Sequence, residues 1–307
     1  MQKSTLLSRL TFFPATLWVL VVVFVFSSCV TDINYAEQST SIPVLNCVLT
    51  NDTVQRLSLT RSVRMNDSYF FKEIKDAKII LYQDDVEIGT FMRVGYDNWQ
   101  LAHTPQSGKT YRIKATLSEG QVLSAETVMP KRLQLQLNQS VDKSFSKNFI
   151  QKSFGSPCWI TIITSDSIIK PASRPTAKDR GEENIGTDHP LADYFNQQGN
   201  MSETISQANT PRFEYYIRLK ADSISGAVPF KLQARFVDHV YVCFRTASAE
   251  YDRYLKTSMQ KIIMRLDTSD PGIWFDETVV YSNVNNGTGI FAAYNDLYFR
   301  YNGDFGF

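Results

Sequence analysis

The feature that most constrains this sequence is a series of seven short strand-like runs between Ile42 and Met129. The runs are "PVLNCVLT", "QRLSLT", "AKIILYQ", "IGTFMRV", "NWQLA", "TYRIKATL" and "VLSAETV", and polar turns such as "QDD", "PQSGK" and "SEG" lie between them. Short strands with this turn chemistry predict an antiparallel β-sandwich of immunoglobulin or transthyretin type over residues 42–130.

One of these runs, "TYRIKATL", shows the alternation of a half-buried strand. Tyr111, Ile113 and Ala115 alternate with Arg112 and Lys114. Because successive strand side chains point to opposite faces, we expect the first set in the core and the second in solvent.

A second, mostly β domain is predicted over residues 131–307, after Pro130. It contains the strand-like runs "CWITIIT", "FEYYIRLKA", "FKLQARF" and "HVYVCFRT". The polar stretch 170–211 predicts a long loop, of the kind that is usually functional or disordered. Within it, "PLADYFNQQG" fits one short helix that is opened by Pro190 and closed by Gly199.

One long amphipathic helix is predicted over residues 248–266. Ser248 is suited to the N-cap, Glu250 to the first turn, and the cations Lys261 and Arg265 to the end of the helix. The apolar residues recur at helical spacing and form one stripe, which we expect to pack on the core: Tyr251, Tyr254, Leu255, Met259, Ile262, Ile263 and Leu266.

The N-terminus has the layout of an export signal. Lys3 and Arg9 precede an apolar run of 17 residues, Leu10–Phe26. This length lies between the roughly 15 residues of a long cleaved core and the roughly 20 that cross a bilayer, so length alone leaves both open.

The residues that end this run favour cleavage. Ser27 and Ser28 directly precede Cys29, in an order that resembles the bacterial lipobox, although Phe26 is bulky for that pattern. The interpretation is a signal peptide over residues 1–28, a lipid on Cys29 and a tether over residues 29–41. The alternative is a retained signal anchor, and both readings attach the chain to a membrane.

The charge balance gives no electrostatic case for nucleic acid. The formal net charge is +1, and it becomes −1 when Lys3 and Arg9 are removed with the signal. Nucleic-acid binding proteins concentrate basic residues, so no nucleic-acid partner is expected.

Three cysteines besides Cys29 lie in strand-like runs: Cys47, Cys158 and Cys243. The simplest interpretation is three buried hydrophobic side chains. One disulfide is also possible from the sequence, but its partners cannot be assigned.

The sequence carries no recognisable catalytic set. His103, His189 and His239 are far apart, and no HExxH, CxxC, GxSxG or phosphate-binding glycine loop is present. We therefore expect no enzyme activity, no cofactor and no metal. The acidic cluster of "DTSDPGIWFDE" (Asp267, Asp270, Asp276 and Glu277) fits a solvated turn better than a calcium loop.

Aromatic residues in polar loops are the candidates for contact with a ligand or partner, because interfaces are enriched in them. Tyr69, Phe70 and Phe71 lie between Asp67 and Glu73, and Trp274 and Phe275 lie in "PGIWFDE".

The loop "NVNNGTG" is a further candidate. Asn285, Asn286 and Gly287 favour positive φ, which predicts a tight connection into the following strand. The alternative is that their amides bind a sugar or a receptor loop.

The segments "VLNCVLTND", "DAKIILYQD", "SGKTYRIKATLSEGQVLSAETVMP" and "VVYSNVNNGTGIFAAYN" together resemble one family, of which "YSNVNNGTGIFAAY" is the most specific part. It is the Bacteroidota lipoprotein family catalogued as domain of unknown function four-two-four-nine. The resemblance implies an acylated N-terminal cysteine, an immunoglobulin-like first domain, a mostly β second part and encoding beside TonB-dependent outer-membrane receptors. The resemblance assigns no catalytic residues to this sequence.

Three functions follow as hypotheses. The first is a non-catalytic accessory protein, lipid-anchored in the outer membrane on its periplasmic or surface side, that assists a TonB-dependent receptor in nutrient uptake. The second is a surface adhesin or fimbria-like subunit. The third is a glycan hydrolase, which requires a cleft with two carboxyl groups about 5–10 Å apart.

Overall fold

The computed structural model describes residues 41–63, 71–138, 146–153, 155–164, 185–195, 201–202, 216–220, 227–234, 240–266 and 279–300. All of them belong to one compact unit, Ser41–Phe307. In these ranges the chain is mainly β, with several sheets and one long helix.

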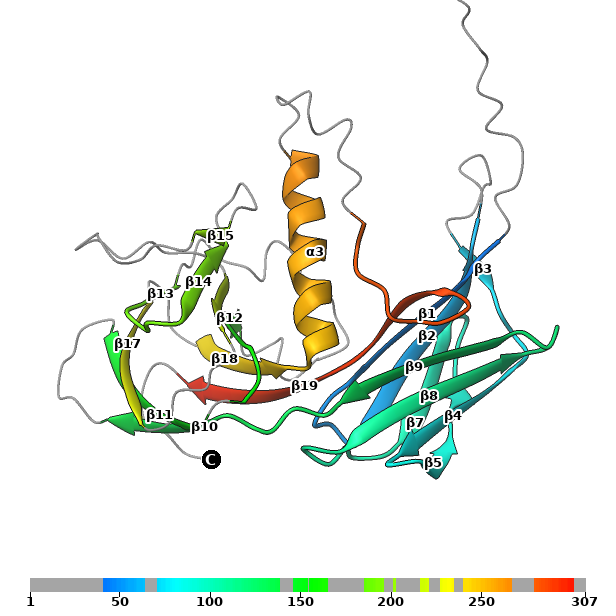
Figure 1. Ribbon diagram of the computed structural model, residues 1–307, viewed down its shortest axis with the longest axis horizontal. Coiled ribbons are helices and arrows are strands. Elements are labelled where there is room, and N and C mark those ends of the chain that lie inside the picture. Colours follow the sequence, from blue (N-terminus) through cyan, green and yellow to red (C-terminus); the bar gives the residue numbers. More distant parts are fainter. Residues whose placement is uncertain are drawn as a thin grey trace, which may run out of the picture. The chain divides into compact units, whose positions relative to one another are not determined.

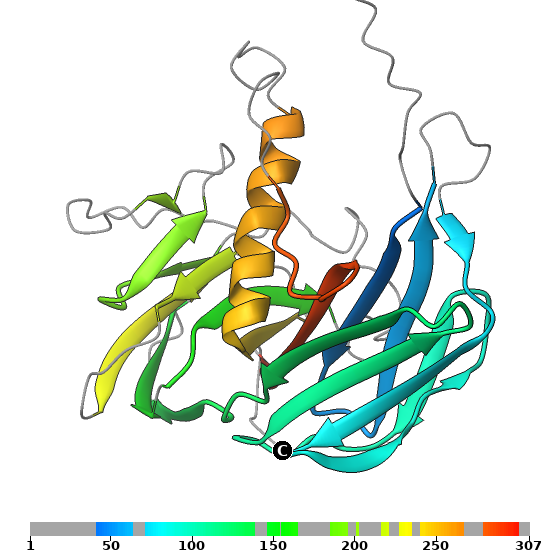
Figure 2. The same cartoon turned by 45° about the vertical axis from the view of Figure 1, so that its right-hand side comes forward.

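The predicted runs between residues 42 and 129 form strands of two sheets (Figures 1 and 2). In one, the order is β5 (Val86–Thr90), β4 (Ala77–Gln83), β8 (Thr110–Leu117) and β9 (Val122–Val128). The other contains β1 (Pro43–Leu49), β2 (Val54–Ser62), β7 (Asn98–Ala102), β6 (Met92–Arg93) and β3 (Phe71–Glu73).

The run "IGTFMRV" was expected to be one strand, and it is two. β5 pairs with β4 and β6 pairs with β7, so the chain changes sheets at Phe91. Phe91 is buried and its N–H donates to the carbonyl of Ile79. Burial of this side chain between the sheets accounts for the break.

Both sheets contribute to one hydrophobic core. Tyr111, Ile113 and Ala115 of β8 are fully buried, whereas Arg112 and Lys114 are not, as the alternation predicted. Facing residues come from β1 and β2, including Leu45, Leu49, Leu57 and Leu59.

The strand β19 (Thr288–Arg300) joins this region to the rest of the sheet. Residues 288–293 pair in parallel with β1, and residues 294–300 pair antiparallel with β18 (Val240–Ala247). Figure 1 shows β19 extending from β1 to β18. The result is an 11-stranded sheet in the described ranges.

Beyond β18 this sheet continues through β12 (Cys158–Thr164), β16 (Tyr216–Leu219), β14 (Ala192–Phe195) and β15 (Met201–Ser202). A third sheet has the order β10 (Gln134–Asn138), β11 (Ser146–Ser153), β17 (Val228–Ala234) and β13 (Ile185–Thr187). A second core lies between them and includes the stacked rings of Phe149 and Phe230 and the edge-on ring of Phe244.

The predicted loop over residues 170–211 and the short helix within it were wrong where the structure describes them. β13, β14 and β15 lie in this stretch, and Ala192 pairs with Leu219 in an antiparallel ladder. Pro190 suits a helix start, but pairing with β16 buries Ala192 and Asp193, and this tertiary contact outweighs the local preference.

The helix α3 (Ala249–Leu266) confirms the predicted long helix. The Ser248 hydroxyl accepts a hydrogen bond from the N–H of Tyr251 at 3.2 Å, which is the expected N-cap. Tyr251 is buried, and Tyr254 and Leu255 pack on the same cluster, so the start of the stripe faces the core. Within the described ranges, no helix combines the length and apolar character that a membrane span needs.

Candidate binding site

A cavity of about 230 Å³ lies where residues 281–285 meet β8, β9 and the first turn of α3. Arg112 and Glu126 come from directly paired positions of β8 and β9. The remaining lining residues are Ser124, Ala125, Glu250, Tyr281, Asn283 and Asn285.

Asn283 fixes the segment of residues 281–285 against β9 and β19. Its Oδ1 accepts a hydrogen bond from the N–H of Phe291 at 2.9 Å, and its Nδ2 donates to the carbonyls of Phe291 at 2.8 Å and Glu126 at 3.2 Å. One side-chain amide thus pairs with β19 and with β9.

Asn285 and Asn286, the other two asparagines of the "NVNNGTG" loop, form hydrogen bonds with β9. The N–H of Asn285 donates to the carbonyl of Ser124 at 2.8 Å, and Nδ2 of Asn286 donates to the carbonyl of Val122 at 3.0 Å. Asn286 has a φ of 59° and Gly289 a φ of 117°. The predicted positive φ is therefore present at Asn286 but not at Asn285 or Gly287.

The cavity wall offers both acceptors and donors. The Glu250 carboxylate accepts a hydrogen bond from the Thr127 hydroxyl at 2.7 Å, in the first helical turn where the N–H dipoles stabilise an anion. Arg112 donates to Asp85 at 2.8 Å, and its guanidinium carbon lies 4.8 Å from the centre of the Tyr82 ring. Ligand pockets are typically about 300–1,000 Å³, so this one suits a small polar group.

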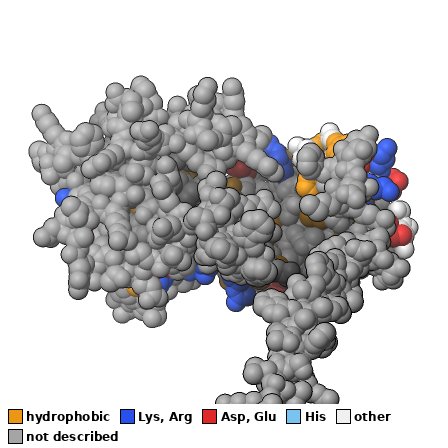
Figure 3. All heavy atoms as spheres, turned by 90° about the horizontal axis from the view of Figure 1, so that it is seen from above, with side chains coloured by type: hydrophobic (Ala, Val, Ile, Leu, Met, Phe, Trp, Pro, Cys, Tyr) orange, Lys and Arg blue, Asp and Glu red, His pale blue; other side chains and the backbone are white. Residues whose placement is uncertain are grey.

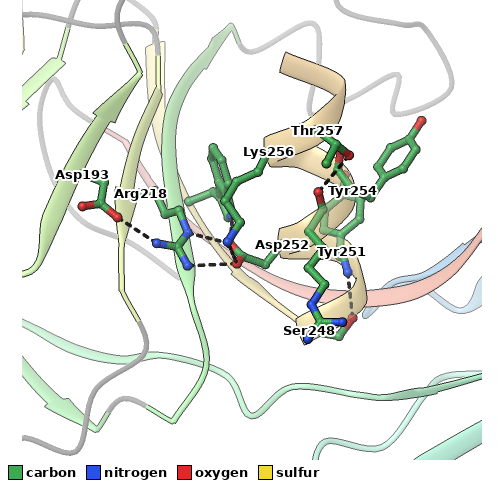
Figure 4. A network of polar contacts seen from close by, with 10 residues as sticks. Asp193, Arg218, Ser248, Tyr251, Asp252, Tyr254, Lys256 and Thr257 are labelled. Atoms are coloured by element: carbon green, nitrogen blue, oxygen red, sulfur yellow. Dashed lines mark hydrogen bonds and ion pairs between the residues drawn. The ribbon is translucent and has the colours of Figure 1, made fainter. Parts of the chain in front are cut away.

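A buried ionic network fixes α3 against β16 and β14 (Figure 4). The guanidinium of Arg218 donates twice to Asp252, at 2.6 and 2.9 Å, and once to Asp193, at 2.8 Å. Lys220 and Lys256 lie 3.0 Å from Asp193 and Asp252 respectively. Burial alone would raise the pKa of Asp252, but the hydrogen bond and charge of Arg218 outweigh it and hold that pKa below its ordinary value.

A second ion pair joins β18 to β19. Arg245 donates to both oxygens of Asp296 at 2.8 Å, and the Tyr298 hydroxyl donates to Asp296 at 2.6 Å. The guanidinium of Arg245 also lies 3.8 Å from the centre of the Tyr294 ring. Because Tyr251 of α3 contacts Arg245 at 3.4 Å, this cluster also positions the start of the helix.

The model of one family, described as "Domain of unknown function (DUF4249)", matches residues 29–299 of the chain. The chain belongs to this family. No curated protein matches it.

Among solved structures, the DUF4249 chain is similar to a crystal structure from Corynebacterium diphtheriae, described as a candidate membrane anchored protein. The identity is 8%, the TM-score is 0.21, and the match covers 68% of this chain and 55% of that one. The chain thus spans about half the length of that protein. The likeness is too low to support an argument about either fold or function.

Several predicted site residues of the DUF4249 chain lie outside the described residues: Cys29, Tyr69, Phe70, Trp274 and Phe275. Phe71 lies in β3 and is 56% exposed. Asn285 and Asn286 are also exposed, and both form hydrogen bonds with β9. Asn285 lines the cavity and Phe71 does not, so these two candidates do not share a site. Their roles in ligand or partner contact stay predictions.

The histidines that the structure describes make local structural contacts. His189 is buried, with Nε2 at 2.7 Å from Oε1 of Gln151, and its Nδ1 accepts the N–H of Leu191. His103 lies 3.3 Å from the Tyr111 hydroxyl, and partial burial lowers its pKa. Within the described ranges, no group of three His, Cys, Asp or Glu side chains could hold a metal ion. The acidic cluster of residues 267–277 lies outside them.

The three described cysteines confirm the simplest interpretation. Cys47, Cys158 and Cys243 are free and buried. Burial raises the pKa of each thiol, which keeps it protonated and unreactive.

Sequence reasoning missed most of the cavity wall. Asn283 stands inside the family motif, two residues before Asn285, and could have been noticed there. The pairing of Arg112 with Glu126 follows from the register of a predicted hairpin. Glu250 had no such signal, since it reaches Thr127 across a sequence separation of 123 residues.

Proposed function

We propose that this DUF4249 protein is a non-catalytic, lipid-anchored accessory protein of the outer membrane that works beside a TonB-dependent receptor in nutrient uptake. The observation that carries the proposal is Cys29, which follows an apolar run and two serines and stands 13 residues before Ile42, the residue that precedes β1. Two or three acyl chains on such a cysteine anchor a protein stably.

The hydrogen bonds of the family motif support a structural, non-catalytic role for its asparagines. Asn283, Asn285 and Asn286 all bond to β9, and Asn283 bonds to β19 as well. The most specific residues of the family thus hold the body's own strands together.

We further propose that residues 42–130 form an immunoglobulin-like sandwich. The order β1-β2-β7 in one sheet and β5-β4-β8-β9 in the other, around a common core, supports this assignment.

The anchor is tested in the native bacterium. Mass spectrometry of the N-terminal peptide should give Cys29 with acyl chains attached, and a Cys29→Ser variant should leave the membrane fraction. Affinity capture from detergent-extracted outer membranes should recover a TonB-dependent receptor with the native protein. Capture without a receptor in repeated trials counts against the accessory function, and an unmodified or uncleaved N-terminus removes the anchor.

One competing function is glycan hydrolysis, for which Glu126 and Glu250, which both line the cavity, are the candidate carboxyl pair. If it were correct, turnover of an oligosaccharide would be lost in Glu126→Gln and in Glu250→Gln alike. We expect no turnover from the native protein.

A further inference from the structure

Five exposed apolar side chains lie along one edge of the sheet that contains β1: Ile42, Phe71, Met92, Val94 and Tyr96. We call this set the tether edge. Each is between 45% and 68% exposed. Large apolar side chains that are exposed together, rather than singly, mark a surface that contacts something.

The pairing of β3 with β2 brings Phe71 close to Ile42. Ser62 pairs with Phe71 on one side, and on the other its N–H donates to the carbonyl of Ile42 at 2.8 Å. Ile42 and Phe71 thus lie two strand spacings apart, about 10 Å. Figure 2 shows β3 beside the end of β2.

The loop after β6 completes the edge. The Tyr96 hydroxyl donates to the carbonyl of Phe71 at 3.5 Å, and Arg93 forms an ion pair with Glu73 of β3. Met92 and Val94 flank Arg93 along the chain and are both exposed.

The chain reaches this edge directly from the predicted lipid anchor. From Cys29 to Ser41 there are 13 residues, which span at most about 45 Å in any conformation. The first described strand begins beside Ile42, so the tether edge is the part of the body tied closest to the membrane.

Resting on the proposed function, which supplies the anchor, we propose that the tether edge lies on the lipid surface that carries the acyl chains of Cys29. Ile42, Phe71, Met92, Val94 and Tyr96 enter the headgroup region, which typically takes apolar side chains to a depth of about 5–10 Å. The body then has a fixed orientation on the membrane.

Three cations near this edge are paired with carboxylates, and Lys72, beside Phe71, is exposed. Arg61 forms an ion pair with Glu119, and Arg93 and Lys75 do so with Glu73. Figure 3 shows hydrophobic and charged side chains next to one another on the coloured part of one face. We therefore expect the contact to depend mainly on apolar burial and to weaken only modestly in salt.

Fluorescence quenching in vesicles tests the proposal. Acylated full-length Phe71→Trp protein is reconstituted in phosphatidylethanolamine–phosphatidylglycerol vesicles whose acyl chains carry bromine. The matched control is Val86→Trp, since Val86 is 66% exposed, apolar and outside the tether edge. The native tryptophans are common to both variants and cancel in the comparison.

We expect the added fluorescence of Phe71→Trp to be quenched at least about twice as strongly as that of Val86→Trp, because its ring lies at the boundary between headgroups and acyl chains. The difference should persist in 0.5 M salt and disappear when a protease cuts the tether. Near-ultraviolet circular dichroism verifies that both variants fold.

Other outcomes separate the two proposals. Flotation of the protein with vesicles but equal quenching of both variants overturns the tether-edge contact and leaves the anchor intact. Failure to float overturns the anchor and the contact together. A dimer in detergent that Tyr96→Ser dissociates, without differential quenching, assigns the edge to a second copy and overturns contact with lipid.

Discussion

Gly289 and Gly120 both have positive φ but differ in their surroundings. A Cβ on Gly289 would lie 2.0 Å from the carbonyl oxygen of Leu45, whereas a Cβ on Gly120 would have nothing within 4 Å. Gly289 is where β19 passes β1, so its missing side chain permits the parallel pairing.

We therefore predict that Gly289→Ala lowers the free energy of unfolding by about 3 kcal/mol or more, because steric overlap with backbone adds to the cost of positive φ. Gly120→Ala should cost only about 1–2 kcal/mol, from φ alone. Urea denaturation of the protein measures both. Equal losses would mean that β1 and β19 move apart at low cost.

The second prediction at this scale concerns Asn283, whose amide makes three hydrogen bonds to backbone groups. At about 0.5–1.5 kcal/mol per bond, Asn283→Ala should lower the free energy of unfolding by about 2–3 kcal/mol. Asn285→Ala is the control, because its side chain makes only a 3.4 Å contact with Ser124. A loss below about 0.5 kcal/mol in Asn283→Ala contradicts the role assigned to this residue.

At the scale of elements, the attachment of α3 depends on a few buried charges. Asp252→Asn leaves the buried Arg218 with Asp193 as its remaining carboxylate partner in the network. Removing one partner of a buried pair typically costs about 3–5 kcal/mol, so we expect a loss of this size in chemical denaturation. Asp85→Asn, which breaks the exposed pair with Arg112, should cost less than about 1 kcal/mol. A comparable loss in both variants would contradict the network's role.

The pairing of Asp252 with Arg218 also makes the free energy of unfolding depend on pH. The pKa of Asp252 is lowered from 3.8 in the folded protein, so the unfolded chain takes up this proton first as the pH falls. The stabilisation is complete above about pH 4 and is lost as the pH falls through the folded pKa. The difference in unfolding free energy between native protein and Asp252→Asn should therefore shrink below pH 4, as measured by urea titration at several pH values. A difference that stays constant to pH 2 would rule out this linkage.

Elements with strong local patterns were predictable, and those that depend on distant pairing were not. β8 and α3 follow from the alternation around Ile113 and from the cap at Ser248. β14 was missed because "ADYF" has no strand alternation of its own and gains its conformation from β16. The cavity was missed for the same reason, because it arises only when residues 281–285 meet β9.

At the scale of the whole molecule, β19 gives residues 42–130 a strand from a distant part of the chain. Val284, Phe291 and Ala293 belong to the same core as Leu45 and Ile113. Residues 44–49 of β1 pair with residues 288–293 of β19. The boundary predicted at residue 130 stays a prediction, but this pairing crosses it.

We predict that a fragment of residues 41–130 is incompletely folded alone, because it lacks these core residues and exposes β1 as an unpaired edge. A synthetic peptide of residues 279–294 should restore the fold when added, seen as a dispersed amide NMR spectrum and a monomeric sedimentation profile. The control peptide carries Gly289→Val, whose side chain would meet the Leu45 carbonyl and prevent pairing. A fragment that is monomeric and well dispersed without any peptide would show that β19 adds to a sandwich that is already stable.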